Sequence, residues 1–405
     1  MSKIEVKVVI GSNYGDEGKG LATRYFSQQS IQNGNPCLNI LYNGGCQRGH
    51  TVELKNGLRH VFHHFGSGSF DYADTYFDRD FIVNPMVFVK EYNELLPIVN
   101  IPCHAVMIYI SPYCRVSTPY DMMINQIIET ARWNERHGSC GCGIWETQQR
   151  YINSEYALCF GDLVELSDEE IVCYLHDIAT KYLPKCLENY GITIIPREYQ
   201  ELINSDGLIQ HYLSDIRTMQ SLVIPISQDC IIPRYSYVVF EGAQGLELDE
   251  DNESAYPNVT ASKTTSLTPA QRVKNFDCNV EICYVTRSYF TRHGAGKFPT
   301  ECKKEVINPD IEDVTNIYNE FQQNIRYGKF DVGEFLSRVK RDMLDSKKII
   351  PKAGTSLLVT HLNYTNGLVG NTTAGKLSEY FDKTYTSSTK FAEDIQLQYK
   401  KGRLQ

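Results

Sequence analysis

Short runs of apolar residues recur along the chain and predict its strands. The runs are IEVKVVIG (4–11), CLNILYNG (37–44), FIVNP (81–85), HAVMIYISP (104–112), YSYVVFEG (235–242), VEICYVT (280–286) and TSLLVTHL (355–362). Each run ends at or close to Gly, Asn, Pro or Ser. Apolar runs of this length that are bounded by turn residues are typical of buried strands.

Helical patterns lie between several of these runs, for example at 85–99 and 122–133. Strands that alternate with helices predict an α/β fold: one large, twisted, mostly parallel sheet with helices on both faces. Residues 164–234 are richer in charge, and we expect them to form a helical insertion within a single domain that spans residues 1–405. Ligands of such sheets gather at the carboxyl ends of the strands.

Composition narrows the class of protein. The net charge of -9 disfavours broad electrostatic capture of nucleic acid, since phosphate neutralisation needs a basic face. We also expect no membrane span, because no apolar stretch reaches the length of about 18 residues that a bilayer requires. The odd count of 13 cysteines is typical of reduced thiols rather than a disulfide framework. Together these features favour a cytoplasmic protein.

The segment GSNYGDEGKG (11–20) follows the first predicted strand. Its glycines let the backbone turn N–H groups toward phosphate oxygens, Lys19 adds a cation, and the next helix adds its dipole. The segment predicts a phosphate loop like that of nucleoside triphosphatases. It departs from the usual loop, because Asn13 stands where the first Gly is expected and Gly20 where a Ser or Thr would bind magnesium. Asp16 is the candidate ligand for that Mg²⁺.

Three motifs together resemble the adenylosuccinate synthetase family. They are GDEGKG (15–20), NGGCQRGHTV (43–52) and FEGAQG (240–245), in that order. Weaker similarity continues through HHFGSG (63–68), IVNP (82–85), CGCGIWE (140–146), YPNVTASKTT (256–265), TRHGAGKFPTE (291–301) and NEF…GKFD (319–331). The resemblance implies the family's fold over nearly the whole chain.

The resemblance also implies a ligase reaction in two steps. The first removes the N1 proton of IMP and phosphorylates O6, and the second lets the amine of L-aspartate displace the phosphate to give adenylosuccinate. In this family a loop carboxylate, here Asp16, is the base at N1, and a histidine, here His50, bridges O6 and the transferring phosphate. Lys19 then contacts the phosphates, Gln244 binds the purine, and Asp16 with the Gly49 carbonyl holds Mg²⁺.

The remaining site residues are assigned through the same resemblance. The donor nucleotide is expected at Gly15, Glu17, Gly18, Gly20, Thr51, His361 and Asn363. The purine monophosphate is expected at Asn13, Gln47, Ser139, Cys140, Arg150 and Thr260, with Arg150 reaching the phosphate from a neighbouring subunit. That reach implies a homodimer. Arg326 and Arg292 are the candidates for binding the amino acid.

Three departures leave the substrates open. QQNIRY (322–327) replaces the family's arginine-rich aspartate loop, THLN (360–363) replaces its guanine-reading TKxD segment, and CQRG (46–49) replaces HNAG. A neutral Asn363 cannot accept from two guanine donors as a carboxylate does. The alternative acceptor is therefore dGMP with ATP or dATP as donor, as in viral relatives of the family, although Asp16 favours IMP. A further alternative is a nucleotide-binding regulator without turnover.

Overall fold

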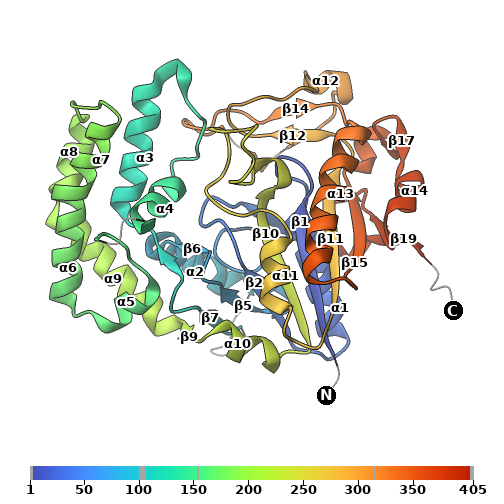
Figure 1. Ribbon diagram of the computed structural model, residues 1–405, viewed down its shortest axis with the longest axis horizontal. Coiled ribbons are helices and arrows are strands. Elements are labelled where there is room, and N and C mark those ends of the chain that lie inside the picture. The colour runs from blue at the N-terminus through green and yellow to red at the C-terminus, as the bar shows by residue number, and fades with distance from the viewer. Residues whose placement is uncertain (1–2, 100–105, 153–154, 314, 317, 402–405) are drawn as a thin grey trace.

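A ten-stranded sheet forms the centre of the molecule, with the strand order β19-β18-β15-β11-β1-β10-β2-β5-β7-β9 (Figure 1). The computed structural model describes residues 3–99, 106–152, 155–313, 315–316 and 318–401. The strands are β1 (Ile4–Gly11), β2 (Cys37–Leu41), β5 (Asp74–Phe77), β7 (Ile108–Ile110), β9 (Ile224–Pro225), β10 (Tyr237–Gly245), β11 (Cys278–Arg287), β15 (Gly354–Thr360), β18 (Lys383–Thr386) and β19 (Gln396–Lys400). Neighbours pair in parallel except for β18 and β19, which confirms the predicted mostly parallel sheet.

The two faces of the sheet bury alternate residues of each strand. On β1, Val8 and Ile10 share a core with α11 (Leu267–Val273) and α13 (Val332–Ile349). The intervening Val9 packs with Leu21 and Phe26 of α1 (Lys19–Gln32) on the other face. Successive side chains of a strand point to opposite faces, so a run that is apolar throughout needs cover on both. Helices therefore lie on both faces, as the sequence predicts.

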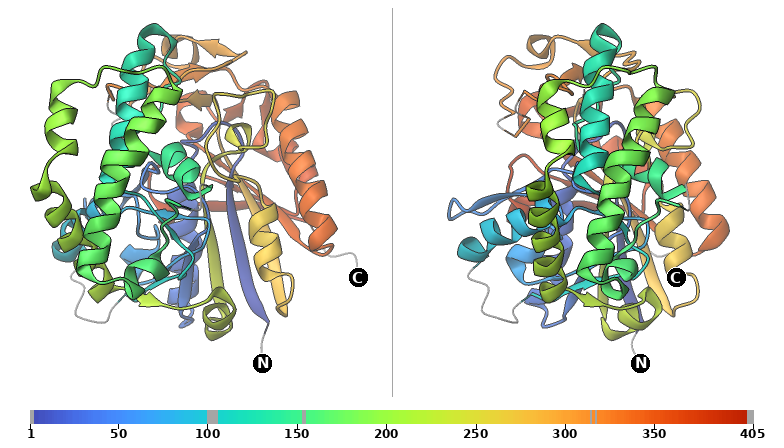
Figure 2. Two further views of the ribbon diagram at one scale, coloured as in Figure 1. Left: turned by 60° about the vertical axis from the view of Figure 1, so that its left-hand side comes forward. Right: turned by 90° about the vertical axis from the view of Figure 1, so that its left-hand side faces the viewer.

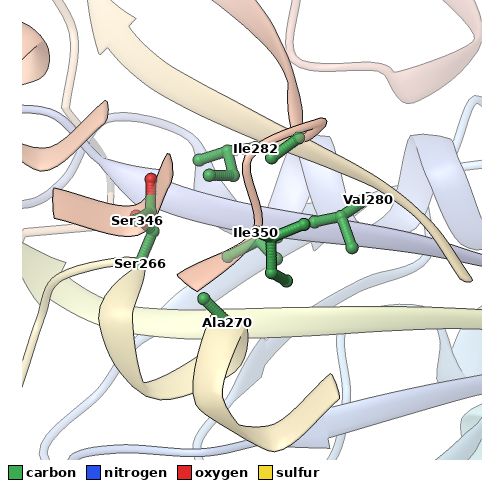
Figure 3. A pocket seen from close by; sticks show the side chains of 8 residues that line it. Ser266, Ala270, Val280, Ile282, Ser346 and Ile350 are labelled. Atoms are coloured by element: carbon green, nitrogen blue, oxygen red, sulfur yellow. The ribbon is translucent and has the colours of Figure 1, made fainter. Parts of the chain in front are cut away.

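The core beneath α11 and α13 is closely packed. Figure 3 shows Ser266, Ala270, Ser346 and Ile350 converging on Val280 and Ile282 of the sheet. The gap between these side chains leaves no space for a water molecule, so it belongs to the core and offers no ligand site.

Two strand predictions are wrong or incomplete. The run at 81–85 supplies only β6 (Ile82–Val83), which pairs with β8 (Arg115–Val116) outside the main sheet, because Pro85 already begins α2 (Pro85–Val99). The main-sheet strand of this region is β5, whose polar first residue and four-residue length gave no clear signal. The run at 104–112 forms only β7, and residues 104 and 105 lie outside the described residues.

A layer of helices covers one end of the sheet (Figure 2, green). It comprises α5 (Phe160–Glu165), α6 (Asp168–Asp177), α7 (Leu183–Asn189), α8 (Arg197–Ile203) and α9 (Asp206–Leu222). Its buried residues, such as Leu175 and Ile216, share one core with Leu95 of α2 and Ile127 of α3 (Pro119–Arg132). The chain then returns to the sheet at β9. Residues 164–234 are thus mainly helical, and their standing as an insertion in a single domain stays a prediction.

The remaining strands and α-helices are short. They are the hairpin β3 (His50–Glu53) and β4 (Arg59–Phe62), the sheet of β12 (Phe290–Arg292), β13 (Glu301–Cys302) and β14 (Arg326–Gly328), the pair β16 (Leu368–Val369) and β17 (Thr372–Thr373), and the helices α4 (Ile144–Ile152), α10 (Gln228–Ile231), α12 (Lys304–Ile307) and α14 (Ala374–Leu377). Among the described residues, no helix is long and apolar enough to cross a membrane.

Candidate active site

A cavity of about 700 Å³ lies where β1, β10 and β15 end. Thirteen of the residues expected from the sequence line it: Gly15, Asp16, Glu17, Gly18, Lys19, Gly20, Gln47, Gly49, His50, Thr51, Gln244, His361 and Asn363. These residues come from four segments far apart in the sequence. The parallel order of the sheet brings them together, since it places the carboxyl ends of neighbouring strands at one edge.

The phosphate loop connects β1 to α1. Gly18 directly precedes the helix with φ 98°, a conformation that side chains other than glycine rarely adopt. Glu17 is buried and accepts a hydrogen bond from the Asn13 backbone N–H at 2.5 Å, and its other oxygen lies 3.7 Å from Lys19 Nζ. Glu17 therefore braces the loop from within. The loop amides, the helix N-terminus and Lys19 form a site suited to a phosphate chain.

Asp16 lies in this loop, is half-buried, and has a φ of 54°. Arg287 donates a hydrogen bond to its backbone carbonyl, and His293 Nε2 lies 2.6 Å from its Oδ2. Burial opposes ionisation, yet the charge of His293 and its contact with the carboxylate hold the pKa of Asp16 well below its usual range. Burial likewise opposes the charged form of His293, but Asp16 raises the pKa of His293 to about 9. The pair is ionised at neutral pH.

His50 begins β3 and is held from behind by a buried carboxylate. Its Nδ1 lies 2.6 Å from Glu241 Oε1, and Glu241 also accepts from the Ser67 backbone N–H at 2.9 Å and lies 3.5 Å from Arg48 Nη1. Burial lowers the pKa of His50 to about 4, although Glu241 opposes the shift. Because a carboxylate only accepts, the neutral ring carries its proton on Nδ1 and leaves Nε2 as an acceptor.

Gln244 ends β10 in the left-handed region, with φ 63°. The register of β1 against β10 shifts between Val9 and Gly11, which brings Gln244 beside the loop at Gly15. Its side chain lines the cavity next to Asp16. A partly exposed amide at a strand end is a common ligand position.

One part of the cavity lining is aromatic. His361 follows β15 with φ 59°, receives support from Thr360 Oγ1 at 2.9 Å from its Nδ1, and stacks on Tyr364 with 6.2 Å between ring centroids. Asn363 is exposed, and Phe391 lines the same region. Flat rings beside an amide suit a nucleotide base.

Arg150 does not occupy the predicted position of an arginine that reaches a neighbouring subunit. It is fully buried, pairs with Asp121 at 2.8 Å, and donates to the carbonyls of Tyr156 and Val116 at 2.7 and 2.6 Å. These bonds hold α4 against α3. A guanidinium with all its directions engaged inside the protein is structural, so this prediction is wrong.

The two arginines expected to bind the amino acid are also engaged elsewhere. Arg326 pairs with Glu301 through Nε at 2.8 Å and donates to the carbonyls of Gly294 and Gly296. Arg292 is buried over the Tyr14 ring, 4.9 Å from its centroid, and donates to the Ala295 carbonyl at 3.0 Å. Neither lines the cavity. Both arginines stabilise the β12–β14 region instead.

Besides Arg150, four residues expected at the purine monophosphate lie outside the cavity lining: Asn13, Ser139, Cys140 and Thr260. The Asn13 side chain is used inside the protein, since it donates to Thr286 Oγ1 at 2.9 Å and accepts from Arg338 at 2.8 Å. Ser139 donates to Asn125 Oδ1 at 2.8 Å. Asn13 is therefore corrected to a structural role.

Sequence reasoning gave no role to Arg48, Glu241, Arg287 or His293. Glu241, Arg287 and His293 contact candidate catalytic residues, and Arg48 lies against Glu241. Glu241 and His293 lie within motifs that the sequence revealed, FEGAQG and TRHGAGKFPTE. A carboxylate inside an apolar strand was the available signal for Glu241, because an unpaired buried charge is rare. The partner of each residue lies far away in the chain, so only the fold reveals the pairs.

Comparison with known proteins agrees with this geometry. Residues 8–344 match the model of the family described as adenylosuccinate synthetase. The adenylosuccinate synthetases of Teredinibacter turnerae and Shewanella frigidimarina are 28% and 29% identical over 303 and 301 residues. Each alignment covers 74% of this chain but only 66% and 65% of the relative, which is less than two thirds.

Two solved structures share the fold. The fully ligated adenylosuccinate synthetase of Plasmodium falciparum has a TM-score of 0.64 at 22% identity and covers 89% of this chain and 77% of that one. The succinoaminodeoxyadenylate synthetase of cyanophage S-2L, bound to dGMP and dATP, has a TM-score of 0.59 at 15% identity and covers 98% and 96%. Because the family model matches residues 8–344, which is most of this chain, the chain belongs to the adenylosuccinate synthetase family.

Proposed function

We propose that the protein is a nucleoside triphosphate-dependent ligase that joins L-aspartate to C6 of IMP and forms adenylosuccinate through a 6-phosphoryl intermediate. The observation that carries this proposal is the convergence of the phosphate loop, Asp16, His50 and Gln244 on one cavity. A protein that only binds nucleotide has no need for an acid–base pair at such a position.

In the first step, the Asp16 carboxylate takes the N1 proton of the purine while O6 attacks the terminal phosphorus of the donor. The bond between that phosphorus and the bridging oxygen breaks, and the nucleoside diphosphate leaves. Lys19 and the loop amides bind the donor phosphates, and His50 contacts O6 and the transferred group. Gln244 orients the purine. Phosphoryl transfer depends chiefly on such positioning and charge neutralisation.

The donor atoms at the cavity fit Mg²⁺. Asp16 provides an ionised carboxylate and the exposed Gly49 provides a carbonyl oxygen, and both residues line the cavity. Mg²⁺ prefers hard oxygen ligands and commonly binds through one or two carboxylates together with substrate phosphates. Asp16 and Gly49 are thus the residues that would hold it, and the bound ion would neutralise the phosphate charge.

In the second step, the aspartate amine attacks C6, the bond between C6 and O6 breaks, and inorganic phosphate leaves. The amine loses a proton as the new C–N bond forms. The two carboxylates of aspartate need cations or amide donors. Arg59 lines the cavity, is exposed, and has the Thr315 hydroxyl as a hydrogen-bond partner at 3.3 Å. We assign Arg59 to one aspartate carboxylate in place of Arg326 and Arg292.

A second candidate reaction uses dGMP as acceptor and ATP or dATP as donor. Its support is the exposed amide of Asn363 in the aromatic part of the cavity lining, where a carboxylate would favour guanine. The cyanophage protein, whose length this chain matches almost fully, is bound to dGMP and dATP. Asp16 favours IMP, because a 2-amino group beside N1 needs room next to that side chain. The remaining alternative is a nucleotide-binding regulator without turnover.

A crossed assay tests these reactions. The purified protein is incubated with Mg²⁺, L-aspartate, one acceptor (IMP or dGMP) and one donor (GTP, ATP or dATP), and phosphate and the succinylated nucleotide are quantified. Product from IMP supports the leading proposal, and product from dGMP alone replaces it with the second. Nucleotide binding without phosphate release in any combination would favour a regulator.

We also propose that the chain forms a homodimer in the cytoplasm, as expected from its family. The burial of Arg150 means that another residue would have to reach the neighbouring site. Light scattering at micromolar concentration checks the dimer, and a monomer with full activity would refute it.

A further inference from the structure

His293 connects the end of β12 to the phosphate loop. Its Nε2 lies 2.6 Å from Asp16 Oδ2 and 2.8 Å from Asn316 Oδ1. The His293 side chain is 21% exposed and lines the cavity. The reaction proposed above assigns no step to it. A side chain that contacts the proposed base at this distance restricts where the carboxylate points.

Asp16 needs support from outside its own loop. Its φ of 54° lies in the left-handed region, which residues with a side chain adopt less readily than glycine does. Two groups hold it: Arg287 grips its backbone carbonyl and is itself braced by Asp313 at 3.1 Å, whereas His293 grips its carboxylate. Backbone and side chain are thus fixed by separate side chains, Arg287 at the end of β11 and His293 just after β12.

Rotation of the Asp16 carboxylate about its Cβ–Cγ bond decides which of its two oxygens faces the cavity. With Oδ2 held by His293, the second oxygen is the one left for substrate. We propose that His293 is the positioning residue for Asp16, fixing the carboxylate so that its second oxygen meets the N1 edge of the bound purine. This inference rests on the proposed ligase function, because it concerns how the Asp16 carboxylate is oriented toward the purine in that reaction.

Kinetics of two variants test the proposal. His293→Val removes the contact, while His293→Gln keeps an amide N–H at a similar reach. We expect His293→Val to lower kcat about 100-fold with less than a threefold change in the KM for donor and acceptor, since misplacing a reacting group by about 1 Å costs on this order. His293→Gln should recover at least tenfold of that loss. His211→Gln, an exposed change on α9, is the matched control and should leave kcat unchanged.

Crystal structures of the wild type and both variants provide a readout that does not depend on turnover. The Asp16 carboxylate should keep its orientation in the wild type and His293→Gln and should rotate in His293→Val. An unrotated carboxylate in His293→Val, or a kcat within threefold of the wild type, would overturn the proposal. If the wild type makes no product, the ligase function fails, and the rotation of Asp16 still decides whether His293 positions it.

Discussion

Asp16 and His50 face the same cavity but are held in opposite ways. Asp16 lies on a loop with a left-handed backbone and is gripped by the cations Arg287 and His293. His50 begins a strand, is 8% exposed, and is held by Glu241, whose side chain is fully buried. Cations keep the carboxylate ionised, whereas burial keeps the imidazole neutral.

The difference sets the protonation state of each group before substrate binds. An ionised Asp16 is in the form that can accept the N1 proton, although its lowered pKa makes it a weaker base. A neutral His50 with its proton on Nδ1 offers only an acceptor at Nε2, so it must take up a proton before it can donate to O6 or the transferred phosphate. Lys19 acts on both, because its charge lowers the pKa of Asp16 and of His50. The phosphate loop therefore couples the two sides of the cavity.

Replacing the base is the most severe way to break this arrangement. We expect Asp16→Asn to lower kcat about 10³-fold or more, because a general base contributes roughly 10²- to 10⁴-fold and the amide cannot accept the proton. The KM of the donor should change little. Steady-state assays of phosphate release give both constants. Retention of more than a tenth of the wild-type kcat would show that N1 is deprotonated by another group.

The support behind His50 gives the next largest effect. Glu241→Gln should lower kcat about 100-fold and destabilise the protein by about 3 kcal/mol or more, since it leaves Arg48 buried without its counter-charge. Kinetics and urea unfolding measure the two effects. Glu281→Gln is the control: it breaks a buried pair with Lys7 at 2.9 Å on β1 and β11, far from the cavity, and should reduce stability alone. Equal kcat values for both variants would contradict a role of Glu241 in holding His50.

Glu146 extends the comparison to a buried carboxyl group whose hydrogen-bond partner is neutral. Glu146 on α4 has a neutral partner, the Asn125 amide at 2.9 Å, and burial raises its pKa to about 7 from 4.5. The folded protein then holds this proton to a higher pH than the unfolded chain does. The stability that this provides is complete below pH 4.5 and is lost as pH rises through about 7.

The test of this linkage compares unfolding free energies at several pH values. Between pH 4.5 and 8, the wild type should lose up to about 3 kcal/mol relative to Glu146→Gln, which has no such proton to release. For Glu165→Gln, an exposed change on α5, the free energy of unfolding should vary with pH as it does for the wild type. Parallel pH profiles for the wild type and Glu146→Gln would mean that Glu146 is ionised in the folded protein.

The sequence predicted the parts of the site that depend on strand order. The phosphate loop, His50 and Gln244 each follow or begin a strand, and a parallel sheet places such segments at one edge. The arginines were predicted wrongly for a physical reason. A guanidinium binds any carboxylate within reach, and the partners Asp121 of Arg150 and Glu301 of Arg326 become visible only when the chain is folded. The local pattern of the sequence predicts strands and loops, but it does not show which charged residues form ion pairs across the fold.

Arg59 gives the smallest expected effect and completes the comparison, because this cavity cation has a neutral hydrogen-bond partner, the Thr315 hydroxyl. Arg59→Ala should raise the KM for aspartate about tenfold and leave kcat within twofold, as expected for the loss of one exposed charge-assisted contact worth roughly 1 to 2 kcal/mol. Lys55→Ala, in the same hairpin but outside the cavity lining, should change neither constant. An unchanged KM in Arg59→Ala would place the aspartate carboxylates elsewhere. In that case the amides of Asn316 and Gln322, which line the cavity beside His293, become the next groups to replace.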